Sequence, residues 1–150
     1  MTSWIMRRAI PHDWPNIATL LEAAGLPLAG AESHLSDFFL AFRGDDLIGS
    51  AGLERYGGTE LLRSVAVSSR ERGRGLGQAL VQQTLIYAAS LQVRQVVLLT
   101  TTAADFFLRF GFQPINRADF PLAAQASVEF QEACLSSATA MSLVLEVEQS

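Results

Sequence analysis

The stretch that decides the fold runs from residue 61 to residue 77. It opens with an apolar run that contains one charge, Leu61-Leu62-Arg63-Ser64-Val65-Ala66-Val67, and it closes on alternating glycines, Arg72-Gly73-Arg74-Gly75-Leu76-Gly77. The apolar run is typical of a central strand, and the periodicity of residues 76–91 predicts a helix. Glycines let a ligand approach the main chain, and the first N–H groups of a helix have no intrahelical partner. The stretch therefore predicts a strand, a loop and a helix start that bind a pyrophosphate.

Two other phosphate-binding loops do not fit these residues. A Walker loop ends in Gly-Lys-Ser/Thr, but this chain has no Lys, because all 11 of its basic residues are Arg. A Rossmann loop reads Gly-x-Gly-x-x-Gly and has an acidic residue about 20 positions on. Here the glycines alternate at 73, 75 and 77, and residues 91–99 contain no acid. A glycine-rich surface turn with solvated arginines remains the alternative to a binding loop.

The length, charge and composition of the chain exclude several classes of protein. The chain has 150 residues and a net charge of −4, with 49% hydrophobic residues. We expect one domain over residues 1–150 and no nucleic-acid partner, because such binders carry a basic excess. One cysteine and two separated histidines predict neither a disulfide nor a metal site. We find no secretory signal and no apolar run of about 18 residues, so we expect a cytoplasmic protein without a membrane segment.

Periodicity predicts the element order β-α-β-β-β-α-β-α-β-β, a mixed α/β (α+β) sheet flanked by helices. We expect Asp13 to cap the first helix and Gly25 to end it. The expected strands cover residues 6–10, 38–43, 47–55, 61–67, 95–100, 112–115 and 141–147. The later helices are expected at residues 76–91 and 103–110, with residues 122–134 partly helical.

The deciding stretch resembles the GNAT superfamily, the Gcn5-related N-acetyltransferases. That family carries Arg/Gln-x-x-Gly-x-Gly/Ala between its fourth strand and third helix, and Arg72, Gly75 and Gly77 match this motif. The preceding residues are similar to the family's Val-x-Pro-x-x-Arg-Gly, with Ser69 in place of Pro. Residues 107–112 resemble its aromatic-x-x-x-Gly-Phe. The resemblance covers residues 4–147.

The resemblance implies acetyl-CoA, bound where the fourth and fifth strands of the sheet splay apart. Backbone groups of Val65 and Val67 would pair with the pantetheine amides, and an N–H near Ala66 would stabilise charge on the thioester oxygen. Such a donor is worth roughly 3 kcal/mol. The pyrophosphate would be held by main-chain N–H groups of the loop and helix start, namely those of Arg72, Gly73, Arg74, Gly75, Leu76, Gly77 and Gln78.

Acetyl transfer needs a neutral amine, so a general base must remove a proton. Glu54 and Glu60 are the candidates, because a hairpin between their strands would bring both near the implied cleft. The alternative is that both are solvated carboxylates at a turn. Many family members protonate the departing thiolate with a Tyr where this chain has Phe107. We expect Phe107 and Thr101 to line the cofactor site instead.

The missing tyrosine leaves two routes for the thiolate. Either another hydroxyl donates the proton, for which residues 100–102 are three consecutive threonines, or the thiolate leaves unaided. A thiol with a pKa of about 8.5 tolerates unaided departure. For the threonines, capping of the strand end is the favoured interpretation.

Residues 99–112 and Phe120-Pro121 are similar to the acetyltransferase domain of N-acetylglutamate synthases and to small acetyltransferases associated with arsenic resistance. The resemblance implies an amino-acid-like acceptor with a carboxylate. Arg63 is a charge in an apolar strand and needs an anionic partner, either a substrate carboxylate or Glu54. By strand alternation Ser64 faces the opposite side.

Other candidates for the acceptor pocket are weaker. Arg117 lies beside Phe120-Pro121, and Ser136, Ser137 and Cys134 follow; for Cys134 an inert core position is the favoured interpretation. A non-catalytic acyl-CoA sensor is the rival function, and Phe107 is the residue that supports it. Phe38, Phe39 and the late strands fit a homodimer contact and core packing equally well.

Overall fold

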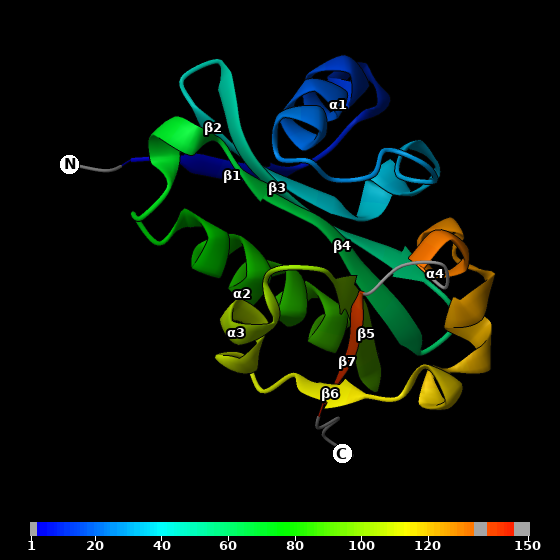
Figure 1. Ribbon diagram of the computed structural model, residues 1–150. Helices are drawn as coiled ribbons and strands as arrows, with labels where there is room; N and C mark the ends of the chain where they lie inside the picture. Colours follow the sequence, from blue (N-terminus) through cyan, green and yellow to red (C-terminus); the bar gives the residue numbers. More distant parts are fainter. Residues whose placement is uncertain (1–2, 134–137, 146–150) are drawn as a thin grey trace. The chain divides into compact units, whose positions relative to one another are not determined.

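The computed structural model describes residues 3–133 and 138–145 (Figure 1). Its seven strands follow the hydrogen-bonding order β1-β2-β3-β4-β5-β7-β6. The chain divides into two compact units, Met1–Leu53 with Ser64–Leu85, and Glu54–Arg63 with Ile86–Ser150. Parallel and antiparallel pairs both occur, so the predicted mixed α/β class is confirmed.

The first unit holds the antiparallel strands β1 (Ile5–Arg8) and β2 (Phe38–Arg43), most of β3 (Asp46–Arg55) and the end of β4 (Thr59–Val67). The hairpin between β2 and β3 turns at Gly44, whose φ of 61° lies in the left-handed region that glycine adopts without strain. This hairpin is the one that the sequence predicts.

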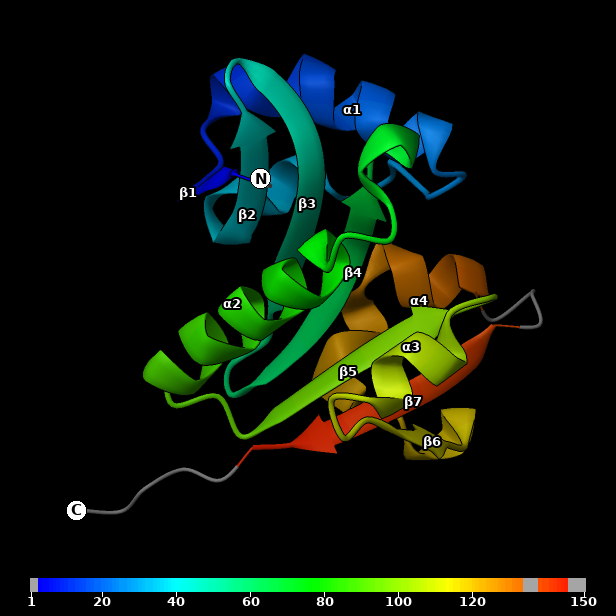
Figure 2. The same ribbon diagram turned by 90° about the vertical axis from the view of Figure 1, so that its left-hand side faces the viewer.

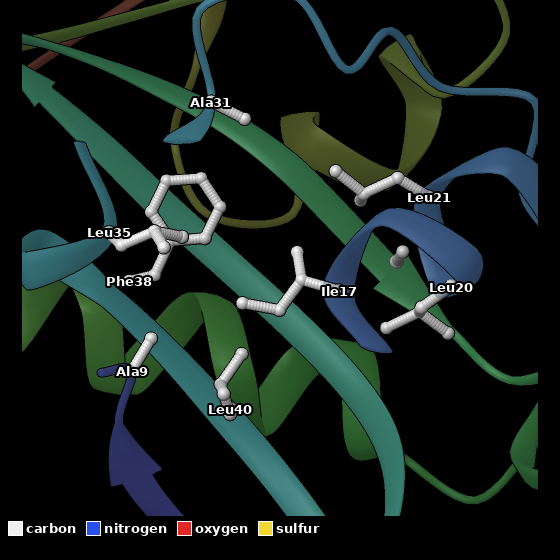
Figure 3. Packing of buried hydrophobic residues seen from close by; sticks show 9 residues of the cluster. Ala9, Ile17, Leu20, Leu21, Ala31, Leu35, Phe38 and Leu40 are labelled. Atoms are coloured by element: carbon white, nitrogen blue, oxygen red, sulfur yellow. The ribbon is translucent and has the colours of Figure 1, made fainter. Parts of the chain in front are cut away.

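Two helices cover this unit, α1 (Trp14–Ala23) and α2 (Leu76–Ser90), which lie on opposite faces of its strands (Figures 1 and 2). Short 3-10 turns precede α1 at Pro11–Asp13, follow it at Glu32–Asp37 and precede α2 at Ser69–Glu71. Figure 3 shows Ile17 of α1 pointing toward Phe38 and Leu40 of β2. Burial of these apolar side chains holds α1 on the strands. The buried members of this core are Ala9, Ile17, Leu20, Leu21, Ala31, Leu35, Phe38, Leu40 and Ala66.

Gly49 of β3 sets how closely α2 approaches. A Cβ added there would lie 2.7 Å from Leu80 Cδ1 and 3.2 Å from both Leu76 Cδ2 and the Ala66 carbonyl oxygen. Only a glycine leaves room for these contacts. The first turns of α2 are therefore fixed against β3.

In the second unit the first part of β4 runs parallel to β5 (Gln95–Thr100). The register joins Thr59–Leu61 to Gln95–Val97, while β4 itself continues to Val67. On its other side β5 pairs antiparallel with β7 (Thr139–Val144), which pairs with β6 (Gln113–Ile115).

Helices α3 (Ala104–Leu108) and α4 (Val128–Ala133) lie on opposite faces of β5 and β7 in both views (Figures 1 and 2). Two 3-10 turns, Arg117–Asp119 and Leu122–Ala126, connect β6 to α4. Phe120 stacks on Phe130 of α4, with ring centroids 4.6 Å apart. One buried hydrophobic cluster of this unit contains Leu61, Val97, Phe120, Ala124, Phe130 and Ala140.

One local expectation is wrong. Asp13 does not cap α1: its carboxylate accepts hydrogen bonds from Arg7, at 2.8 Å, and from the Ile10 N–H, at 2.8 Å. Ser64 has a φ of 58°, which a regular strand does not contain, and Arg63 and Ser64 are both buried. Element boundaries otherwise match within a few residues, and no helix in the described part of the chain has the length and apolarity needed to cross a bilayer.

Candidate functional site

The glycine-rich loop lies in the first unit, at the N-terminus of α2. β4 ends at Val67, the 3-10 turn Ser69–Glu71 follows, and residues 72–75 are exposed before α2 begins. Gly73 and Gly75 both have a φ of 81°, and a Cβ on either would meet no atom within 4 Å. Their main chain therefore faces open space in a conformation that other residues rarely adopt.

The start of α2 presents main-chain donors. The Ala79 N–H donates to the Gly75 carbonyl at 3.0 Å, which is the first bond of the helix. The N–H groups of Leu76, Gly77 and Gln78 precede this bond and so have no intrahelical acceptor. The helix dipole adds partial positive charge at the same end. Donors of this kind suit an anion.

The charge of the loop is more positive than the sequence suggests, because Glu71 is paired. Arg43 of β2 makes two hydrogen bonds to its carboxylate, at 2.7 and 3.0 Å, and this pairing lowers the pKa of Glu71. The guanidinium of Arg74 lies 3.8 Å from the same carboxylate. Arg70, Arg72 and Arg74 are exposed. Sequence reasoning missed Arg43, since no local pattern links it to the loop.

A hollow of about 350 Å³ lies in the first unit between α1, the β2–β3 hairpin and the residues before the loop. Its polar lining includes Asn16, Thr19, Asp46, Ser68, Arg70 and Arg72. The sequence did not predict it, because its walls come from three separate segments.

The end of β4 carries the residues predicted to meet the pantetheine. Val65 and Val67 are half-buried, and Ala66 is buried in the core of the first unit. Just before them, the Ser50 hydroxyl donates to the Ser64 carbonyl oxygen at 2.7 Å. The sequence did not predict a role for Ser50, because a serine within a strand belongs to no motif.

In the second unit Arg63 is held by two carboxylates. Its Nη1 lies 2.6 Å from Glu54 Oε2, and its Nε lies 3.4 Å from Glu129 Oε2. The Arg63 side chain is 0% exposed and that of Glu54 is 1% exposed. Of the two partners that the sequence left open, the structure supplies Glu54, and it adds Glu129 of α4. No signal in the sequence points to Glu129.

The buried position of Glu54 excludes the alternative of a solvated carboxylate. Burial by itself raises the pKa of this carboxyl, but hydrogen bonds from Tyr56, Arg63 and Ser127 outweigh that effect and lower it. The Tyr56 hydroxyl donates directly to Glu54. Burial, together with this bond, raises the pKa of Tyr56 to about 12. Glu54 is therefore an ionised carboxylate with a weak affinity for protons.

Glu60 is also buried, at 1% exposure. Its Oε2 accepts the Tyr56 N–H at 2.8 Å, and its Oε1 lies 3.6 Å from Arg55 Nε. The two glutamates thus lie at the two ends of one turn, as the hairpin predicts. Glu60 accepts a hydrogen bond from the main chain of Tyr56, and Glu54 accepts one from its side chain.

The residues after β5 have structural contacts. Thr100 Oγ1 accepts the Ala103 N–H at 3.0 Å, which confirms strand-end capping for this threonine. Thr101 is exposed. Phe107 is buried on α3, with ring centroids 5.1 Å from Phe106 and 5.9 Å from Phe112.

Of the remaining candidates for the acceptor pocket, the structure describes only Arg117. Arg117 Nη2 donates to the Ala138 carbonyl at 2.8 Å. Cys134, Ser136 and Ser137 lie outside the described residues. Among the residues that are described, no group of three or more His, Cys, Asp or Glu side chains is arranged to hold a metal ion.

Known proteins resemble this chain in sequence and in fold. An uncharacterized N-acetyltransferase of Chlorobaculum tepidum is 32% identical over 90 residues, which cover 59% of this chain and 57% of that protein's length. The acetyltransferase-like segment therefore spans little more than half of this relative.

Two solved structures show the fold. A Mycobacterium tuberculosis protein in complex with CoA and NLQ superposes with a TM-score of 0.77 at 23% identity, covering 95% of this chain and 99% of that one. N-acetylglutamate synthase of Neisseria gonorrhoeae, complexed with coenzyme A and N-acetyl-glutamate, gives a TM-score of 0.83 at 22% identity. That match covers 97% of this chain and 36% of the synthase.

The family model described as "Acetyltransferase (GNAT) domain" matches residues 34–114, a segment that includes β2 to β5, the glycine-rich loop and α3. The match spans more than half of the chain and contains the two motifs on which the sequence resemblance rests. The loop at the start of α2 and the strand order agree with it. The resemblance is confirmed: this chain belongs to the GNAT acetyltransferase domain family.

Proposed function

We propose that this protein is an acetyl-CoA-dependent N-acetyltransferase that transfers acetyl directly to the primary amine of a small, amino-acid-like acceptor. The observation that carries the proposal is the open main chain at Gly73 and Gly75, followed by the donors at the start of α2. Membership of the acetyltransferase family supports the reaction class. The CoA complexes of the two structural neighbours support the cofactor.

The loop would hold the pyrophosphate through the main-chain N–H groups of residues 72–78. Arg72 and Arg74 would add charge, and Arg43 makes the two short hydrogen bonds to the Glu71 carboxylate that Arg74 approaches only to 3.8 Å. The backbone of Val65 and Val67 would hold the pantetheine, and an N–H near Ala66 would stabilise charge on the thioester oxygen. Acetyl-CoA supplies the activated acetyl group; the protein supplies position and hydrogen bonds.

Glu54 and Glu60 are the proposed bases, and their contacts differ in how well they suit a proton acceptor. The lowered pKa of Glu54 makes it a weak proton acceptor. Its hydrogen bonds to Tyr56 and Arg63 favour a role in holding these side chains. Glu60, or a water that it orients, is then the better candidate to take the amine proton. Thr101 and Phe107 would line the cofactor.

An anionic group on the acceptor would require Arg63, Ser64 or Arg117. Arg63 already binds Glu54 and Glu129, so an acceptor carboxylate would have to share its guanidinium with them. The synthase neighbour, which was crystallised with N-acetyl-glutamate, favours a glutamate-like acceptor. An arsenical or phosphinic analogue of glutamate would present the same amine and a similar anion.

Release of CoA thiol from acetyl-CoA, measured across a panel of amino acids and their analogues, tests the reaction. We expect thiol release that depends on one class of acceptor and yields an equal amount of acetylated amine. A Glu60→Gln variant should lower kcat by about 10²–10⁴-fold if it removes the base. Binding of acetyl-CoA without release of thiol under every acceptor would overturn catalysis.

A non-catalytic acyl-CoA-binding module is the second candidate function, and one observation favours it. Phe107 is buried among aromatic rings, so the position that often carries a tyrosine has no proton to give. The same panel separates the two functions, because the module would bind acetyl-CoA and leave it intact.

A further inference from the structure

One residue of β4 has a conformation that a strand does not normally contain. Among the described residues that are not glycine, only Ser64 and Gln92 have a positive φ. Gln92 lies in the turn after α2, whereas Ser64, with a φ of 58°, lies inside β4. A residue other than glycine is strained in this region and persists only where its surroundings enforce it. Left-handed residues in strands occur at bulges, which re-aim groups near active sites.

A buried hydrogen bond reaches Ser64 from the same unit. Ser50 of β3 is completely buried, and its hydroxyl donates to the Ser64 carbonyl oxygen at 2.7 Å. This bond fixes the orientation of the peptide group between Ser64 and Val65. Because a trans peptide is planar, its C=O and N–H point in opposite directions. The bond that draws the Ser64 carbonyl toward Ser50 therefore directs the Val65 N–H away from Ser50.

We infer that Ser50 is a positioning residue for the cofactor, holding Ser64 in its left-handed conformation so that the Val65 N–H points away from β3 toward the pantetheine. The inference rests on the proposed function, which assigns the backbone of Val65 to the pantetheine amides. It adds a residue that no motif of the sequence marks, and it gives a purpose to the strain at Ser64.

A cycle of four proteins tests this role: wild type, Ser50→Ala, Ser64→Gly and the double variant. Glycine adopts a φ of 58° without strain, so it keeps the conformation when the Ser50 hydroxyl is gone. Calorimetric titration with CoA should show an affinity about tenfold weaker for Ser50→Ala. The affinity of Ser64→Gly for CoA, measured without acceptor because Ser64 is a proposed acceptor contact, should stay within about twofold of wild type, and that of the double variant should recover to within about threefold.

Thr84→Val is the matched control. Thr84 is also completely buried, and its hydroxyl donates to a main-chain carbonyl, that of Leu80, at 2.8 Å. The variant loses a comparable bond away from β4 and should bind CoA as wild type does. An equal loss of affinity in Ser50→Ala and Thr84→Val, or no rescue by Ser64→Gly, would show that Ser50 acts on stability alone.

A second measurement keeps this inference separate from the proposed function. In the absence of CoA, the amide NMR signals of Val65 and Ala66 should move in Ser50→Ala and return toward their wild-type positions in the double variant. Unmoved signals would overturn the positioning role even if CoA binds. Absence of CoA binding in the wild type would overturn the proposed function, whatever the NMR signals show. If Ser50→Ala does not fold, a folded double variant with wild-type signals supports the role, and an unfolded double variant contradicts it.

Discussion

At the scale of single residues, the buried charge of Arg63 is the feature with the largest energetic consequence. Its side chain is 0% exposed and contacts Glu54 and Glu129, so it neutralises carboxylates from two separate parts of the second unit. Removing one member of a buried ion pair leaves the other charge without compensation, which costs about 3–5 kcal/mol.

Arg63→Met should therefore lower the free energy of unfolding by about 3–5 kcal/mol, measured by urea denaturation. The matched control is Arg109→Met, because Arg109 is an exposed arginine of the same unit. The control should change stability by no more than about 0.5 kcal/mol. Similar losses in the two variants would contradict the assignment of Arg63 as a buried counter-ion.

Glu54 makes the stability of the protein depend on pH in a defined direction. Its folded-state pKa is lowered from the ordinary value of 4.5, so the folded state binds its proton less readily than the unfolded state does. The stabilisation is complete above about pH 4.5 and is lost as the pH falls through the lowered pKa. Glu54→Gln should remove this contribution.

Urea denaturation of wild type and Glu54→Gln at a series of pH values measures the effect. The gap in unfolding free energy between the two proteins should be constant above about pH 5 and should shrink below about pH 4.5. A gap that widens as the pH falls would show that the carboxyl is protonated in the folded state.

At the scale of elements, the approach of α2 to β3 determines where the loop lies. Gly49→Ala would place a Cβ 2.7 Å from Leu80 Cδ1, so the helix or the leucine must move. Overpacking of this kind costs about 1–3 kcal/mol. We expect that loss in unfolding free energy, together with weaker CoA binding, because the donors at the start of α2 move with the helix.

A second substitution checks the cause. In a Leu80→Ala background the nearest clash is removed, and Gly49→Ala should cost at least about 0.5 kcal/mol less than it does alone. An unchanged cost would mean that Leu80 is not the group that excludes a side chain at residue 49.

The elements also show what a sequence can predict. The β2–β3 hairpin, β5 and α2 carry strong local signals, namely turn residues and apolar periodicity, and their predicted bounds lie within a residue or so of the structure. Asp13 was mispredicted because a contact outweighs the local rule: Arg7 binds the Asp13 carboxylate, which therefore does not cap the helix. The left-handed φ of Ser64 has no signal in the sequence.

At the scale of the whole molecule, the motif residues predicted the family, and the family match confirmed it. The loop could be located because its glycines, arginines and helix start are consecutive in sequence. The ion pairs of Arg63 with Glu129 and of Arg43 with Glu71 could not be predicted, because the two partners of each pair are far apart in sequence. The spacing of charged residues along the chain does not indicate which of them will pair.

The proposed function depends on the loop at the start of α2 binding a diphosphate. The most direct measurement compares the affinities of CoA and of pantetheine, which lacks the diphosphate and the adenosine 3′-phosphate attached to it, by calorimetric titration of the same protein. Hydrogen bonds to a charged group are worth about 1.5–3 kcal/mol each, so CoA should bind at least about tenfold more tightly than pantetheine. Equal affinities, or no binding of CoA, would contradict the account.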